Sequence, residues 1–297
     1  MFARRIAFIL LALVAAGPAA AQDKIRAIAS FSILADLVKN VGGDRVDVAP
    51  LIGPNGNAHV YDPSPTDSRR VADARVVVVN GLGFEGWLGR LVEASGTKAA
   101  VVVASAGVSP RSSASETRLG DDKTDPHAWQ SVANAKRYVS NIRDALIKAD
   151  PAGEGAYKGN AVAYQARLDA LDREVRDVVA RIPADRRRVV TSHNAFGYFQ
   201  DAYGVAFSAP QGMSSEAEAS ARDVARIIGQ IRNERISAVF LENVTDARLL
   251  KLIAAETGAR IGGTLYSDAL TDANGPAPSY VDLIRHNVRE LAAALAN

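Results

Sequence analysis

Short apolar runs alternate with stretches of helical periodicity along most of the chain. The apolar runs predict eight strands, four in each half, over residues 25–30, 46–51, 76–80, 100–104, 189–192, 205–209, 238–242 and 260–265. Strands that alternate with helices are typical of α/β domains with a parallel sheet. We therefore expect an α/β fold with two similar lobes, each a mostly parallel four-stranded sheet flanked by helices.

A single apolar stripe connects the two halves. Its members follow one another at alternating steps of four and three residues: Tyr157, Ala161, Tyr164, Leu168, Leu171, Val175, Val178 and Ile182. This spacing predicts one helix over 156–183, roughly 40 Å long at 1.5 Å per residue, which Pro183 ends. A heptad stripe can also indicate a coiled-coil dimer, but only about four heptads are present within an α/β chain. We favour a stiff backbone helix that joins an N-terminal lobe (22–155) to a C-terminal lobe (184–297).

The first 21 residues have the pattern of a signal peptide. Arg4 and Arg5 precede an apolar run over 6–16, and small residues follow up to Ala21. The run is too short to span a bilayer. We expect export to the periplasm with cleavage after Ala21, by the Sec route rather than the twin-arginine route that the paired arginines also suggest.

The composition narrows the chemistry. The chain contains no cysteine, which excludes a disulfide framework, a thiolate metal site and a catalytic cysteine. Because N-terminal lipidation also needs a cysteine, we expect no lipid anchor. The sequence has 35 basic and 33 acidic residues, and loss of Arg4 and Arg5 with the signal peptide would balance them. We therefore expect no nucleic-acid partner.

Four histidines occur in the sequence. His59, His127 and His193 lie in predicted loops, where binding residues usually lie in α/β folds. Taken alone, each is more often a structural hydrogen-bonding residue than a metal ligand. His286 lies on the C-terminal helix away from its apolar stripe, and we expect it to be an exposed surface residue.

Four short motifs place these histidines in a recognisable order. They are Asn57-x-His59-x-x-Asp62-Pro63-x-Pro65, Asp125-Pro126-His127-x-Trp129, Ser192-His193-x-Ala195-Phe196-Gly197-Tyr198-Phe199 and Leu265-Tyr266-Ser267-Asp268. Together they resemble the ZnuA/TroA-like group, the zinc- and manganese-binding solute-binding proteins of ABC importers, over essentially the whole mature chain. The resemblance implies one metal ion held between the lobes by His59, His127, His193 and Asp268. It also implies a membrane permease as partner, and we expect the binding protein to be a monomer.

The ligand set bears on the metal and on alternative functions. Three imidazoles and one carboxylate suit one Zn²⁺ per chain in near-tetrahedral geometry. Mn²⁺ prefers more oxygen ligands and stays the alternative, because Asp268 could bind through both oxygens. A zinc hydrolase is the remote alternative, but catalytic zinc usually keeps an open water position and the sequence has no His-Glu-x-x-His helix. Binding of a metal chelate and a role as a surface adhesin are less favoured. We expect no enzymatic activity.

Several further residues have two interpretations. Glu242 ends a predicted strand and either orients a ligand histidine or is a carboxylate at the cleft edge. Trp87 and Trp129 are expected in packing. Residues 107–125 form a loop without histidine, and we interpret its acidic residues (Glu116, Asp121, Asp122 and Asp125) as solvated. Many zinc-binding relatives have a histidine-rich loop here, so its absence leaves room for manganese or for zinc loading by a periplasmic zinc chaperone.

Overall fold

The computed structural model describes residues 24–112 and 124–296. The predicted signal peptide with its cleavage site, and residues 113–123 of the predicted loop, lie outside the described residues. Within the described ranges, no helix has the length and apolar character needed to cross a membrane.

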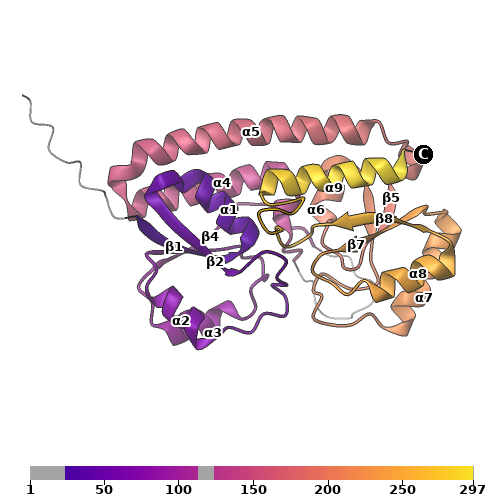
Figure 1. The fold of residues 1–297 in the computed structure, drawn as a ribbon, viewed down its shortest axis with the longest axis horizontal. Coiled ribbons are helices and arrows are strands. Elements are labelled where there is room, and N and C mark those ends of the chain that lie inside the picture. Colours follow the sequence, from indigo (N-terminus) through magenta and orange to yellow (C-terminus); the bar gives the residue numbers. More distant parts are fainter. Residues whose placement is uncertain (1–23, 113–123, 297) are drawn as a thin grey trace, which may run out of the picture.

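Eight strands form two four-stranded sheets, one in each lobe (Figure 1). They are β1 (Ile25–Phe31), β2 (Val46–Ile52), β3 (Val76–Val79), β4 (Ala100–Val103), β5 (Arg188–Val190), β6 (Ala206–Ser208), β7 (Ala238–Glu242) and β8 (Arg260–Leu265). The orders are β2-β1-β3-β4 and β6-β5-β7-β8, and all the pairs are parallel. Each sheet thus repeats the same arrangement of its second, first, third and fourth strand. The predicted α/β fold with two parallel four-stranded sheets is confirmed.

Helices cover both sheets. In the first lobe they are α1 (Ser32–Gly42), α2 (Pro65–Ala72), α3 (Leu88–Ser95) and α4 (Val132–Ala149); in the second they are α6 (Gly197–Tyr203), α7 (Ala221–Glu234), α8 (Arg248–Thr257) and α9 (Tyr280–Leu295). In Figure 1, α1, α4 and α9 lie beside the long helix α5, and α2 and α3 lie at the far side of their lobe. Four-strand α/β layers of this kind carry binding residues at the carboxyl ends of the strands.

The long helix α5 (Glu154–Ala180) has 27 residues and runs along both lobes (Figure 1). It packs on α1 and α4 in the first lobe and on α9 in the second. Its buried stripe includes Leu168 and Val175 as predicted, but continues to Val179, and Val178 is only partly buried. The prediction at Val178 was wrong because a straight α-helix has 3.6 residues per turn, so a 3.5-residue repeat drifts around its surface.

The apolar core is continuous across the lobes. One buried cluster contains Phe31 of β1, Leu168 of α5, Leu265 of β8 and Tyr280 of α9. Hydrogen bonds also cross the boundary, since the backbone N–H of Leu270 donates to the Ser32 hydroxyl at 3.0 Å. A second, smaller cluster lies around Val190, Ile227 and Leu250 in the C-terminal lobe. The shared core opposes a wide separation of the two lobes.

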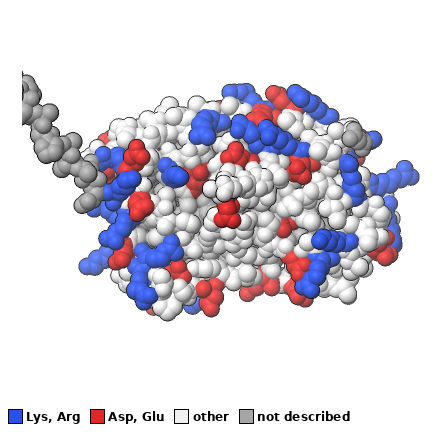
Figure 2. Space-filling model, viewed as in Figure 1, with Lys and Arg blue, Asp and Glu red and all other residues white. Residues whose placement is uncertain are grey.

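The surface agrees with the balanced composition. On the face drawn in Figure 2, basic and acidic side chains of the described residues are interspersed and form no continuous basic stripe.

His286 departs from its prediction as an exposed residue. It is half-buried on α9, with Nε2 2.9 Å from the Thr264 carbonyl oxygen and its ring 4.9 Å from that of Tyr266. The prediction was wrong because α9 packs over β8, so its contact face is wider than the apolar stripe alone.

Candidate metal centre

The four residues singled out from the sequence converge between the lobes. His59 lies in the loop after β2, and His127 immediately precedes a 3₁₀ turn (Ala128–Gln130). His193 follows β5 and Asp268 follows β8. The carboxyl ends of the parallel strands of both sheets face this point, which brings two residues from each lobe together.

Local structure fixes the segment that carries His59. Ser64 caps α2 in a capping box with Asp67, and Pro65 occupies the first helical turn. On the other side of His59, the Asn57 side-chain oxygen accepts a hydrogen bond from the His59 backbone N–H at 3.0 Å. His59 is thus held between a helix start and an Asx-type turn.

The Asp268 carboxylate lies at the centre of the cluster. Its Oδ2 is 3.1 Å from Nε2 of His193 and 3.4 Å from Nε2 of His59. Its Oδ1 is 3.6 Å from Nε2 of His127, and the Nε2 atoms of His59 and His127 are 3.3 Å apart. One donor atom from each of the four residues lies within 4.8 Å of all the others.

This cluster contains buried polar atoms without partners. Both carboxylate oxygens of Asp268 and Nε2 of His193 are buried and make no hydrogen bond within the described part of the chain. Leaving such an atom unpaired costs about 1–3 kcal/mol. A cation between the lone pairs would satisfy all of these atoms together, so the donor set fits a metal ion.

The electrostatics of the cluster favour positive charge. Burial opposes the charged form of His193, but the carboxylates of Glu242 and Asp268 outweigh it and hold the pKa of this imidazole well above its usual range. Burial likewise opposes ionisation of Asp268, yet His193 and His127 hold its pKa well below the usual value. For His59, burial dominates and lowers the pKa. The pKa directions of His193 and Asp268 indicate a site that stabilises a cation beside an ionised carboxylate.

Glu242 contacts a histidine of the cluster. Its Oε2 lies 2.7 Å from Nδ1 of His193, and its Oε1 accepts the backbone N–H groups of Ser192 at 2.7 Å and His193 at 2.9 Å. Both residues have fully buried side chains. Of the two interpretations of Glu242, the structure supports the one in which it orients His193.

Asp125 plays the same part for His127, and the sequence analysis missed it. Its Oδ1 accepts the His127 backbone N–H at 3.0 Å and lies 2.9 Å from Nδ1 of the ring. Asp125 is completely buried, so its interpretation as a solvated loop residue was wrong. The available signal was its position two residues before the histidine, from which a carboxylate can reach the ring nitrogen.

A buried network of polar side chains contacts the segment that carries His127. The sequence did not indicate this network. The Asn80 amide donates to the Pro126 carbonyl at 2.8 Å and its oxygen accepts from the Tyr138 hydroxyl at 2.5 Å. Glu85 in turn accepts the Asn80 backbone N–H at 2.6 Å. Trp129 is fully buried in this region, and Trp87 is nearly so, which confirms their prediction as packing residues.

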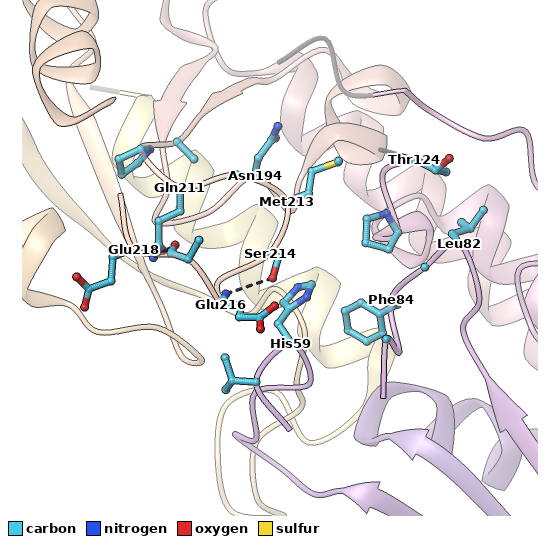
Figure 3. A pocket seen from close by; sticks show the side chains of 18 of the residues that line it. His59, Leu82, Phe84, Thr124, Asn194, Gln211, Met213, Ser214, Glu216 and Glu218 are labelled. Carbon is cyan, nitrogen blue, oxygen red and sulfur yellow. Dashed lines mark hydrogen bonds between the residues drawn. The ribbon is translucent and has the colours of Figure 1, made fainter. Parts of the chain in front are cut away.

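A cleft of about 1480 Å³ opens onto the cluster, lined by residues of both lobes that include Phe84, Asn194, Met213 and Glu216. Figure 3 shows His59 pointing into this cleft, and its ring centroid lies 4.9 Å from that of Phe84. The His59 side chain is 5% exposed, whereas the other three side chains of the cluster are completely buried. Among the four residues of the cluster, His59 is therefore the one nearest to solvent, on the side of this cleft.

Comparisons with known proteins agree with this geometry. The family model described as "zinc-uptake complex component A, periplasmic" matches residues 28–294. The manganese-binding lipoprotein MntA of Halalkalibacterium halodurans is 34% identical, over 97% of this chain and 96% of its own length. The iron-binding protein YfeA of Yersinia pestis is also 34% identical, over 93% of this chain and 88% of its own.

A solved structure has the same architecture. The periplasmic zinc-binding protein TroA of Treponema pallidum superposes with a TM-score of 0.85 at 31% identity, covering 92% of this chain and all of that one. All three names describe metal-binding proteins and none describes an enzyme, in agreement with the prediction. A further relative, the manganese ABC transporter substrate-binding lipoprotein PsaA of Streptococcus mitis, is 30% identical over all of this chain and 98% of its own length. The chain therefore belongs to the ZnuA family and is a metal-binding, substrate-binding component of an ABC importer.

Proposed function

We propose that the protein binds one Zn²⁺ through His59, His127, His193 and Asp268 and delivers it to the membrane permease of an ABC importer. The observation that carries this proposal is the convergence of three imidazoles on a buried carboxylate whose oxygens have no hydrogen-bond partner within the described residues. Three nitrogen ligands and one oxygen ligand match the preference of Zn²⁺ for tetrahedral sites. Two ligands from each lobe would close the site around the ion.

The cleft defines the route of the ion in this proposal. Hydrated Zn²⁺ enters past His59, the ligand side chain closest to solvent, and exchanges its water for the imidazoles and Asp268. Because α5 contacts both lobes and the core is shared, closure is a small tilt with loop ordering rather than a wide hinge motion. Release then needs the permease to move the lobes apart.

Manganese is the second candidate, and one observation favours it. The two Asp268 oxygens point to different histidines, Oδ1 to His127 and Oδ2 to His59 and His193. A carboxylate placed in this way can bind through both oxygens and give the higher coordination number and oxygen content that Mn²⁺ prefers. The relative MntA is named as manganese-binding.

The test is to purify the exported protein and measure its bound metals by elemental mass spectrometry. We expect about one zinc per chain. The metal should be lost in the His127→Ala variant and retained in the His286→Ala variant, because His286 lies outside the cluster. Manganese in place of zinc would keep the site and change the cargo, and a folded chain that takes up neither added ion would refute the proposal.

We also propose that the protein is a monomer in the periplasm, exported with cleavage after Ala21. Loading by a periplasmic zinc chaperone stays an open alternative. Osmotic-shock fractionation tests the proposed location, because a protein free in the periplasm is released into the shock fluid whereas a membrane-anchored protein stays with the membranes.

A further inference from the structure

Asn57 connects the lobes at the edge of the metal centre. Its side-chain amide nitrogen donates to the Ser215 hydroxyl at 2.9 Å and to the Val244 carbonyl at 3.0 Å, and both acceptors belong to the C-terminal lobe. Its side-chain oxygen accepts the backbone N–H of His59 at 3.0 Å within the N-terminal lobe. The Asn57 side chain thus donates hydrogen bonds to the C-terminal lobe and accepts one from His59 in the N-terminal lobe.

The other two histidines of the cluster are held differently. His127 is oriented by Asp125, which belongs to its own lobe, and His193 by Glu242, which also belongs to its own lobe. For His59, the orienting side chain is itself bound to the opposite lobe. The position of His59 therefore depends on how closely the lobes approach each other.

The loop that carries Asn57 has a second attachment to the C-terminal lobe. The backbone N–H of Asn55 donates to the Leu270 carbonyl at 2.8 Å, two residues beyond Asp268. Asn55 has a positive φ of 56°, a conformation that asparagine tolerates better than most residues and that turns the loop toward this contact. Two residues of this loop, Asn55 and Asn57, are thus hydrogen-bonded to the C-terminal lobe.

We propose that Asn57 is a positioning residue that couples lobe closure to the placement of His59, so that separation of the lobes releases this ligand first. When Val244 and Ser215 move away, the amide loses both acceptors and the Asn57–His59 turn loses its external support. His59 lies on the open side of the cluster, where its departure would expose the ion to the cleft. This inference rests on the proposed metal-binding function and specifies its release step.

An alternative role for Asn57 is purely local. An Asx turn needs only the side-chain oxygen of residue 57 and the backbone N–H two residues later. The substitution Asn57→Asp separates the two roles, because the carboxylate keeps the acceptor for His59 and removes both donors to the C-terminal lobe. It also places negative charge beside the Val244 carbonyl oxygen.

The experiment mixes Zn²⁺-loaded protein with excess chromophoric chelator in a stopped-flow instrument and measures the rate of metal release. The chelator concentration is raised until the rate no longer depends on it, so that the observed rate is that of Zn²⁺ dissociation. Loss of the two hydrogen bonds that join Asn57 to the C-terminal lobe should speed release about tenfold or more in N57D. The association rate should change less than the release rate. Ser215→Ala removes one of the two acceptors and should speed release about threefold.

The matched control is Asn141→Asp. The Asn141 amide also donates to two backbone carbonyls, of Ala104 and Ala106, but both lie in its own lobe. This variant should lose stability and release Zn²⁺ at the wild-type rate. A wild-type release rate in both N57D and S215A would overturn the coupling role, and S215A decides alone if N57D does not fold. Failure of the wild-type protein to bind Zn²⁺ or Mn²⁺ would instead refute the proposed function itself.

Discussion

At the scale of single residues, the centre depends on carboxylates that contact the outer nitrogens of its histidines. Glu242 reaches Nδ1 of His193, and Asp125 reaches Nδ1 of His127. Such partners fix the tautomer, so that Nε2 presents its lone pair to the ion, and they increase the basicity of the ligand. They also add negative charge in a buried site, where it is little screened.

Replacement of Glu242 by glutamine tests this contribution. The glutamine oxygen can still accept the backbone N–H groups of Ser192 and His193, so the fold should persist, but the negative charge beside His193 is lost. We expect metal affinity to fall about 10- to 100-fold, measured by competition with a chelator of known affinity. Glu256→Gln, which changes an exposed carboxylate of the same lobe, should leave it unchanged. Equal affinities in the two variants would contradict the role of Glu242.

How far these residues could be predicted depends on the distance between partners along the chain. The four residues of the cluster, and Asp125 two positions before His127, stand in short motifs that can be recognised in the sequence. Asp125 was misinterpreted because the loop before it is polar, and polarity indicates exposure unless a buried partner is known. The partner of Asn57 lies 187 residues away, and no local pattern could indicate that contact.

At the scale of elements, the strands were predicted to within two residues at each end. Parallel strands covered on both faces read as continuous apolar runs, as in Val76–Val79, where all four residues are buried. The short strands β5 and β6 were predicted too long: β5 ends at Val190, before the polar Thr191 and Ser192, and β6 excludes the apolar Val205 and Ala209 at its two ends. Strand pairing and the common order of the two sheets could not be predicted, because they depend on contacts between runs far apart in sequence.

The helix α5 permits a test of how its buried stripe contributes to stability. Leu168 is fully buried in the core shared by both lobes, whereas Val162 on the same helix is 67% exposed. Leu168→Ala should lower the free energy of unfolding by about 2–5 kcal/mol through lost burial and a residual cavity. Val162→Ala should change it by less than about 0.5 kcal/mol. Urea denaturation followed by circular dichroism measures both, and equal midpoints would contradict the placement of the stripe.

At the scale of the whole molecule, the proposed ion would be bound by two residues from each lobe and would act as a cross-link between them. Asp268 and His193 belong to one lobe and His59 and His127 to the other, so the complete ligand set exists only when the lobes are together. Hydrogen bonds next to the cluster reinforce this arrangement, since Trp129 and Gln130 both donate to the Ser267 carbonyl, at 2.9 and 2.7 Å. An ion that binds only the native state must stabilise it in proportion to its affinity.

Free Zn²⁺ at 100 times its dissociation constant should therefore raise the free energy of unfolding by about 2.7 kcal/mol. Because the ligands come from both lobes, the gain should appear in one cooperative transition and be strongly reduced in His193→Ala, which leaves the C-terminal lobe with Asp268 alone. His286→Ala changes a histidine that contacts Thr264 outside the cluster. The free energy of unfolding of this metal-free variant can therefore differ from that of the wild type, but Zn²⁺ should raise it by the same amount. A Zn²⁺-induced shift of equal size in His193→Ala would mean that the ion binds elsewhere. A shift confined to one of two separate transitions would mean that it does not connect the lobes.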